Sequence, residues 1–158
     1  MRRGLVVLLF VAACGRRIEF AAGERPTVPR DKLPKVVQPL LPERGIYAAG
    51  GGTTSAPWRV TLTLDGDLVA GAATSAASFA DMKTSKKKLD AATLGEVVTL
   101  ADRAWREPRE APAHPTADYD EIVIFVDGKD AWLIEGYGPL AGGAAEALMT
   151  RLRKLSGS

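Results

Sequence analysis

The sequence predicts an α+β fold in which one antiparallel sheet of four to five strands, built from two hairpins, carries two helices on a single face. Two observations support this prediction. Strand-like segments occur in two pairs, each joined at an Asp-Gly dipeptide. An amphipathic helical pattern follows each pair. The expected order along the chain is therefore ββα followed by ββα.

The first hairpin is expected between residues 59 and 73. Residues 59–64 (RVTLTL) alternate between apolar and polar side chains, which is typical of a strand with one buried face. Asp65 and Gly66 follow, and a second apolar run spans residues 68–73. Asp-Gly suits the positive φ values of a two-residue turn, so these segments predict a tight hairpin.

The second hairpin is expected between residues 121 and 135, where EIVIFV leads into Asp127 and Gly128 and then into AWLIE. Residues 60–66 (VTLTLDG) align with residues 122–128 (IVIFVDG), since residue 122 lies 62 positions after residue 60. An internal duplication is one explanation of this match. The other, which the sequence favours, is that two amphipathic hairpins share a pattern without common origin. Both explanations give the same architecture.

A helix is expected after each hairpin. Asp90 is a good N-cap, and a helical apolar stripe follows it until Pro108 ends the helix. The stripe consists of Leu94, Val97, Val98, Ala101, Ala104 and Trp105. Residues 141–155 repeat the pattern and place basic residues in the last turns, where cations suit the helix dipole. Trp105 and Trp132 are expected in the core rather than stacked on a ligand.

The chain begins with an apolar segment that is too short to cross a membrane. Arg2 and Arg3 precede residues 5–10 (LVVLLF), and small residues then lead to Cys14, the only cysteine. This is the layout of a secretory signal, whereas a transmembrane helix needs about 20 apolar residues. The sequence therefore predicts a signal peptide over residues 1–13.

Residues 11–14 (VAAC) resemble the lipobox of bacterial lipoproteins, in which an aliphatic residue and two small residues precede an obligatory cysteine. The resemblance implies thioether lipidation of Cys14, cleavage before it and acylation of the new amino terminus. Several acyl chains anchor a protein far more firmly than one. Gly15 stands where an aspartate would favour the inner membrane, so the resemblance implies an outer-membrane location facing the periplasm or the surface.

The stretch after Cys14 is rich in proline. Residues 15–44 contain five prolines, which prevent a helix of any length, so residues 14–44 are expected to form a lipidated linker and residues 45–158 a single domain. Packing of the linker's apolar residues onto the domain is an open alternative. These residues are Val36, Val37, Leu40 and Leu41. The domain resembles only small uncharacterised secreted bacterial domains with a glycine-rich start and a closing helix.

Cleavage removes the apparent basicity of the chain. The full sequence has 21 basic and 19 acidic side chains, and residues 1–13 contain two arginines and no acid, so 21 minus 2 leaves 19 of each sign. Nucleic-acid binding depends on neutralising phosphates, and a neutral chain with no long basic stripe offers little footing for it. We therefore expect no nucleic-acid partner. The expected partners are the membrane, through the lipid anchor, and an envelope protein.

The sequence offers few catalytic candidates. His114 lies between prolines in residues 108–116, and a catalytic histidine needs an orienting neighbour. Ser85 and Lys88 have the serine-x-x-lysine spacing of penicillin-recognising enzymes, yet that family needs two further motifs. Lysines 86 to 88 are better explained as a charged strand edge or loop that discourages edge pairing. We predict neither a cofactor nor a metal.

The candidate binding site is an acidic group that could dock a basic partner. Its members are Asp118, Asp120, Glu121, Asp127 and Asp130. A sheet face, a sheet edge or residues 45–57 are further candidate surfaces. The sequence thus favours a membrane-anchored envelope lipoprotein with a noncatalytic binding or structural module. The alternative is a small periplasmic hydrolase that uses His114 with Asp118 or Asp120.

Overall fold

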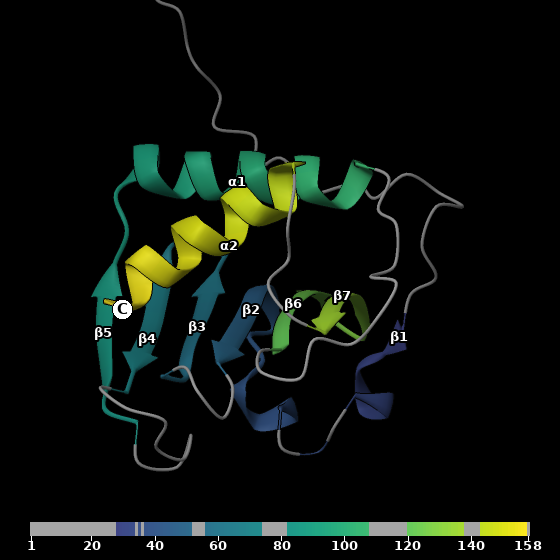
Figure 1. Ribbon diagram of the computed structural model, residues 1–158. Helices are drawn as coiled ribbons and strands as arrows, with labels where there is room; N and C mark the ends of the chain where they lie inside the picture. The colour runs from purple at the N-terminus through teal and green to yellow at the C-terminus, as the bar shows by residue number, and fades with distance from the viewer. Residues whose placement is uncertain are drawn as a thin grey trace, which may run out of the picture.

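The protein has an α+β fold in which a single antiparallel sheet carries two helices on one face (Figure 1). The computed structural model describes residues 28–33, 35, 37–51, 56–73, 82–107, 120–137 and 143–157. The fold class, the antiparallel sheet and the common face of the helices are as the sequence predicts. The sheet is larger than expected, with seven strands in the order β1-β7-β6-β2-β3-β4-β5.

The elements have the following bounds. The strands are β1 (Val28–Pro29), β2 (Arg44–Gly51), β3 (Trp58–Thr63), β4 (Asp67–Ala72), β5 (Thr84–Lys88), β6 (Asp120–Asp127) and β7 (Asp130–Tyr137). The helices are α1 (Ala91–Arg106) and α2 (Gly143–Ser156), and two short 3-10 turns are η1 (Arg30–Lys32) and η2 (Gln38–Leu40). The two predicted hairpins are β3–β4 and β6–β7, and β2 lies between them in the sheet.

The turns of the hairpins differ from the prediction, one in length and the other in position. In β3–β4, Leu62 pairs with Leu68, and the connection is a longer loop in which Gly66 takes the positive φ of +91°. In β6–β7, Asp127 pairs directly with Asp130, so the turn residues are Gly128 and Lys129 rather than Asp127 and Gly128. Gly128 has φ +66°, and no non-glycine residue in the described ranges has a positive φ. Glycine in the first turn position with a negative φ in the second is typical of a type II′ turn.

The helices pack on the sheet through one apolar core. Val97, Ala101 and Ala104 of α1 and Leu148 and Leu152 of α2 are buried against it. The strands supply Ile46, Ala48, Trp58, Val60, Leu62, Leu68, Ala70, Val123 and Phe125. Trp105 is buried in this core and meets Phe125 edge-to-face at 5.5 Å between ring centroids, as predicted. The side chain of Trp132 lies outside the described part of the protein.

Asp90 caps α1 as predicted. Its carboxylate accepts hydrogen bonds from the backbone N–H and the hydroxyl of Thr93, each at 2.8 Å. These bonds favour the charged form, so the pKa of Asp90 is held below its ordinary value of 3.8. The helix ends at Arg106, before Pro108 as the sequence predicts.

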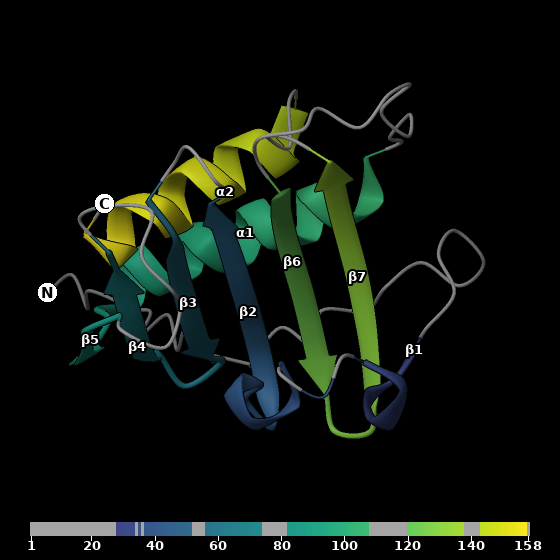
Figure 2. The same ribbon diagram turned by 60° about the horizontal axis from the view of Figure 1, so that its bottom comes forward.

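The opposite face of the sheet is covered in part by the described residues between 28 and 42, which we call the strap (Figure 2). Leu33 and Leu41 are buried against Tyr47 and Ile124. Val37 and Leu40 pack beside them, so the strap adopts the alternative in which the linker's apolar residues join the domain; Val36 lies outside the described residues. Burial under the strap raises the pKa of Tyr47, and the positive charge of Arg59 opposes this.

Polar contacts fix the strap in place. The guanidinium of Arg30 donates to the carbonyls of Pro42 and Leu41, both at 3.0 Å. The hydroxyl of Thr61 on β3 donates to the carbonyl of Leu40 at 2.9 Å. These bonds satisfy carbonyls of irregular backbone, which needs such partners when it is buried.

The two hairpins do not superimpose in the way that a duplication at an offset of 62 requires. Val60 and Leu62 face the helices, whereas Ile122 and Ile124 lie in the cluster under the strap. Side chains alternate between the faces of a strand, so aligned residues of a duplication should face the same way. This difference favours the explanation by shared hairpin pattern.

Gly50 is the first position at which this packing can be tested. A Cβ there would lie 2.7 Å from Nε1 of Trp58, a residue that is only 1% exposed. We expect Gly50→Ala to lower the free energy of unfolding by about 1–3 kcal/mol, the usual cost of overpacking a core. The control is Gly95→Ala on α1, where a Cβ meets nothing within 4 Å and alanine should raise stability by about 0.5–1 kcal/mol. Denaturant unfolding measures both, and equal effects would contradict the packing at Gly50.

Candidate functional site

The acidic residues predicted to form one binding site do not all meet in the structure. Glu121 and Asp127 lie near opposite ends of β6, about 20 Å apart at the usual rise per strand residue. Asp127 pairs with Arg44 at 2.9 Å, and Glu121 pairs with Arg153. Asp120 and Asp130 are described only in their backbone, and Asp118, like His114, lies outside the described residues. Glu121 and Asp127 therefore act as separate ion-pair partners within the domain.

Glu121 belongs to a buried polar group on the helix-facing side of the sheet. Glu121, Gly50 and Trp58 are neighbours on β6, β2 and β3. Glu121 is only 3% exposed, and Nη2 of Arg153 donates to its carboxylate from α2. The guanidinium carbon of Arg153 also lies 5.6 Å from the centroid of the Trp58 ring, within the range of a cation–π contact.

This arrangement fastens α2 to the sheet. Burial lowers the pKa of Arg153, but an arginine side chain stays charged in proteins, so the ion pair persists. Gly50 lies on β2, between Trp58 on β3 and Glu121 on β6. Because Gly50 has no side chain, the indole of Trp58 can lie against the backbone of β2. From the sequence, Arg153 is predicted only as one of the basic residues that suit the dipole of the last helix. The signal missed there was Glu121 in phase with Val123 and Phe125, which marks a carboxylate on the buried face.

Strand β5 lies at one edge of the sheet, beside the C-terminal end of α2 (Figures 1 and 2). All five of its residues are exposed. Lys88 pairs with Asp67 at 3.0 Å, and Lys87 donates to the carbonyl of Leu155 at the end of α2, at 3.2 Å. The prediction of a charged strand edge is confirmed here.

Ser85 and Lys88 do not form a catalytic pair. Residues three apart on a strand point to opposite faces. The hydroxyl of Ser85 instead contacts the carbonyl of Ala70 at 3.5 Å, and Lys88 is engaged by Asp67. The serine-x-x-lysine spacing therefore has no chemical consequence in this fold.

Positive charge is concentrated at this edge. We call β5 together with Lys83, which precedes it, the basic edge. It carries four lysines, and of these Lys83 and Lys86 have neither an ion pair nor a side-chain hydrogen bond with any described residue. The last turn of α2, which carries Lys154, lies next to it, since Lys87 bonds to the carbonyl of Leu155. The whole chain has 21 basic and 19 acidic side chains, so the basic edge is a local excess of positive charge.

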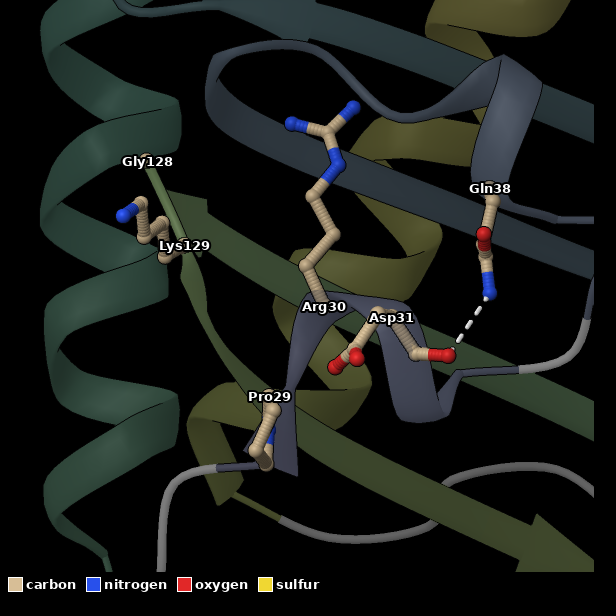
Figure 3. Close-up of a pocket in the computed structure, with 6 residues that line it drawn as sticks. All are labelled: Pro29, Arg30, Asp31, Gln38, Gly128 and Lys129. Atoms are coloured by element: carbon tan, nitrogen blue, oxygen red, sulfur yellow. Dashed lines mark hydrogen bonds between the residues drawn. The ribbon is translucent and has the colours of Figure 1, made fainter.

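A second candidate is a pocket of about 500 Å³ between the strap and the β6–β7 turn (Figure 3). It is lined by Pro29, Arg30, Asp31, Gln38, Gly128 and Lys129. Two of its polar side chains already bond to the backbone of the strap. The guanidinium of Arg30 donates to the carbonyls of Pro42 and Leu41. The amide of Gln38 donates to the carbonyls of Leu33 at 2.7 Å and Asp31 at 3.2 Å. Figure 3 shows the side chains of Arg30 and Lys129 pointing in different directions. The pocket thus lacks convergent polar groups left over for a ligand.

Within the described ranges, no three histidine, cysteine or acidic side chains come together in a way that could hold a metal ion. Among the helices described, none is both long enough and apolar enough to cross a membrane. Comparison of the chain with models of known protein families and with curated protein sequences finds no match.

Two arginines of α2 allow a test of the buried ion pair. Arg153 pairs with a carboxylate that is almost fully buried, and Arg151 pairs with the exposed Glu96 at 2.7 Å. We expect Arg153→Ala to lower the free energy of unfolding by about 2–3 kcal/mol, less than for a fully buried pair because Arg153 still contacts water. Arg151→Ala should cost about 1 kcal/mol or less.

Denaturant unfolding at neutral pH measures both variants. If they lose the same stability, Glu121 and Arg153 do not fasten α2 to the sheet. The double variant Glu121→Gln with Arg153→Met should recover part of the loss, because no unpaired charge then remains buried.

Proposed function

We propose that this protein is a lipid-anchored lipoprotein of the bacterial envelope whose domain is a noncatalytic binding module. The anchor rests on Cys14, preceded by two arginines, a short apolar run and the VAAC motif. Thirteen residues, 15–27, separate Cys14 from the first residue of β1. Fully extended, they reach about 45 Å at most, so this anchor would keep the domain close to the lipid surface.

The binding function rests on one observation, the basic edge. An edge strand presents unpaired backbone N–H and C=O groups, which are the groups that an incoming strand uses. Here all five residues of that strand are exposed, three of them are successive lysines, and the end of α2 contacts the strand through Lys87. A partner of opposite charge can reach it without displacing any part of the described structure.

Replacing Cys14 tests the anchor. We expect Cys14→Ser to abolish incorporation of radiolabelled palmitate and to leave precursor uncleaved or release the protein from the membrane fraction, because the thioether cannot form. Gly15→Asp is the matched control: it should keep the label and move the protein from the outer-membrane to the inner-membrane fraction. Palmitate labelling that survives Cys14→Ser would refute the lipoprotein proposal.

Photocrosslinking in intact cells tests the binding function. A photoreactive residue in place of Lys86 should yield a discrete crosslinked product, since this side chain lies on the basic edge. The same residue in place of Thr99, an exposed position on α1, is the control and should yield none. If neither these positions nor Lys129 in the β6–β7 turn give a product, the domain is not a binding module.

A further inference from the structure

The hydrogen-bond pattern of β4 and β5 identifies the groups that the edge leaves open. The backbone N–H of Leu89 donates to the carbonyl of Gly66 at 2.9 Å, so these two residues form a hydrogen-bonded pair. The same register places Lys88 opposite Asp67, and then Lys87 opposite Leu68. In an antiparallel ladder, hydrogen-bonded and non-hydrogen-bonded pairs alternate. Ser85 and Lys87 therefore bond to β4, whereas Thr84, Lys86 and Lys88 direct their N–H and C=O groups away from the sheet.

The lysine side chains divide between the two faces. Lys87 stands opposite Leu68 on the helix-facing side, where its ammonium group contacts the end of α2. Lys86 and Lys88 are on the other face, beside Val69 and Asp67. A strand added to β5 would place alternate side chains directly across from Lys86 and Lys88, at the Cβ separation of about 4.5–5.5 Å usual for such pairs.

We propose that the basic edge binds an extended acidic segment of a partner protein as an eighth strand of the sheet. The partner strand alternates carboxylate residues with apolar or small ones, so that its carboxylates face Lys86 and Lys88 and its backbone pairs with Thr84, Lys86 and Lys88. This inference rests on the proposed binding function and names the chemistry of the partner.

A peptide fits the edge better than other anions do. The open edge offers carbonyl acceptors as well as N–H donors, and only a backbone with its own donors satisfies both. A lipid phosphate or a polyphosphate would use the lysines and leave the edge carbonyls to water, so these carbonyls would add nothing to its binding. A second copy of β5, paired antiparallel and centred on Lys86, would bring Lys86 against Lys86, which is unfavourable. The lysines thus discourage neutral or basic strands and admit an acidic one.

Binding of synthetic peptides to the full chain, purified in detergent, tests the proposal. The probe is a short peptide that alternates glutamate with valine, and its affinity is measured by isothermal titration calorimetry. The first control replaces each glutamate with lysine. The second keeps the glutamates and carries an N-methyl group on alternate backbone nitrogens, which removes the donors of one strand edge. We expect the probe to bind and both controls to bind at least about tenfold more weakly, because they lose charge pairing or backbone pairing.

Two substitutions at Lys86 separate charge from backbone pairing. Lys86→Gln removes only the charge and should weaken binding of the probe by about two- to fivefold. Lys86→Pro also removes an N–H that faces away from β4, so it costs the sheet no hydrogen bond but should weaken binding by a further tenfold or so. Lys35→Gln, at an exposed position of the strap, is the matched control and should change nothing. Unfolding midpoints of the variants, equal to that of the parent chain, show that the fold is intact.

The outcomes are distinct from those that test the proposed function. If the N-methylated peptide binds as well as the probe, or Lys86→Pro binds it as well as Lys86→Gln, the edge does not pair with a strand and the inference is wrong. Polyphosphate that displaces the probe from all variants alike, or a dimer in sedimentation that Lys86→Pro abolishes, overturns it too. A crosslink at Lys129 in cells without peptide binding would leave the binding module standing and refute only the basic edge as its site.

Discussion

The central strand β2 holds the sheet together, because it pairs with β3 along one side and with β6 along the other. Six successive residues from Gly45 to Gly50 are buried, so both faces of the strand are covered. Small side chains make this possible. On the helix side Gly50 leaves room for the indole of Trp58, and on the strap side Ala49 lies in the cluster that Leu33 and Leu41 complete. The two hairpins become one sheet only through this strand.

The strap explains why the two halves of the sheet differ. It pairs with β7 through β1 and returns along the face to β2, and its apolar residues cover β2, β6 and β7. Among the described residues, the contact of the strap that reaches furthest toward β5 is the hydrogen bond from Thr61 of β3 to the carbonyl of Leu40. On β4 and β5 the same face therefore carries polar and charged residues, among them Asp67, Lys86 and Lys88. That face of β4 and β5 also carries Val69 and Gly71, and two of its four polar residues (Asp67, Thr84, Lys86 and Lys88) are lysines.

The sequence revealed the elements whose periodicity is strong and missed those whose burial is unusual. Both hairpins and both helices follow from alternation, Asp-Gly turns and the Asp90 cap. β2 (RGIYAAGG) escaped because a strand buried on both faces does not alternate, and glycine and alanine have low strand propensity. Glu121 was read as part of an acidic surface, because no local signal shows that Arg153 approaches it from a helix 32 positions later. The length of the β3–β4 turn and the position of the β6–β7 turn depend on strand pairing, which the dipeptide alone does not fix.

The order of strands also separates the beginning of the described chain from the basic edge. β1, which starts at Val28, and β5 are the two outermost strands of the sheet. Six inter-strand steps of about 4.8 Å place them roughly 29 Å apart across the sheet. In the proposed lipoprotein, the tether therefore leaves the domain on the side away from β5, and a strand added to β5 extends the sheet without meeting the tether. If the partner is anchored in the same membrane, the tether of this protein does not have to cross the edge at which the two chains pair, because β1 and β5 lie on opposite sides of the sheet.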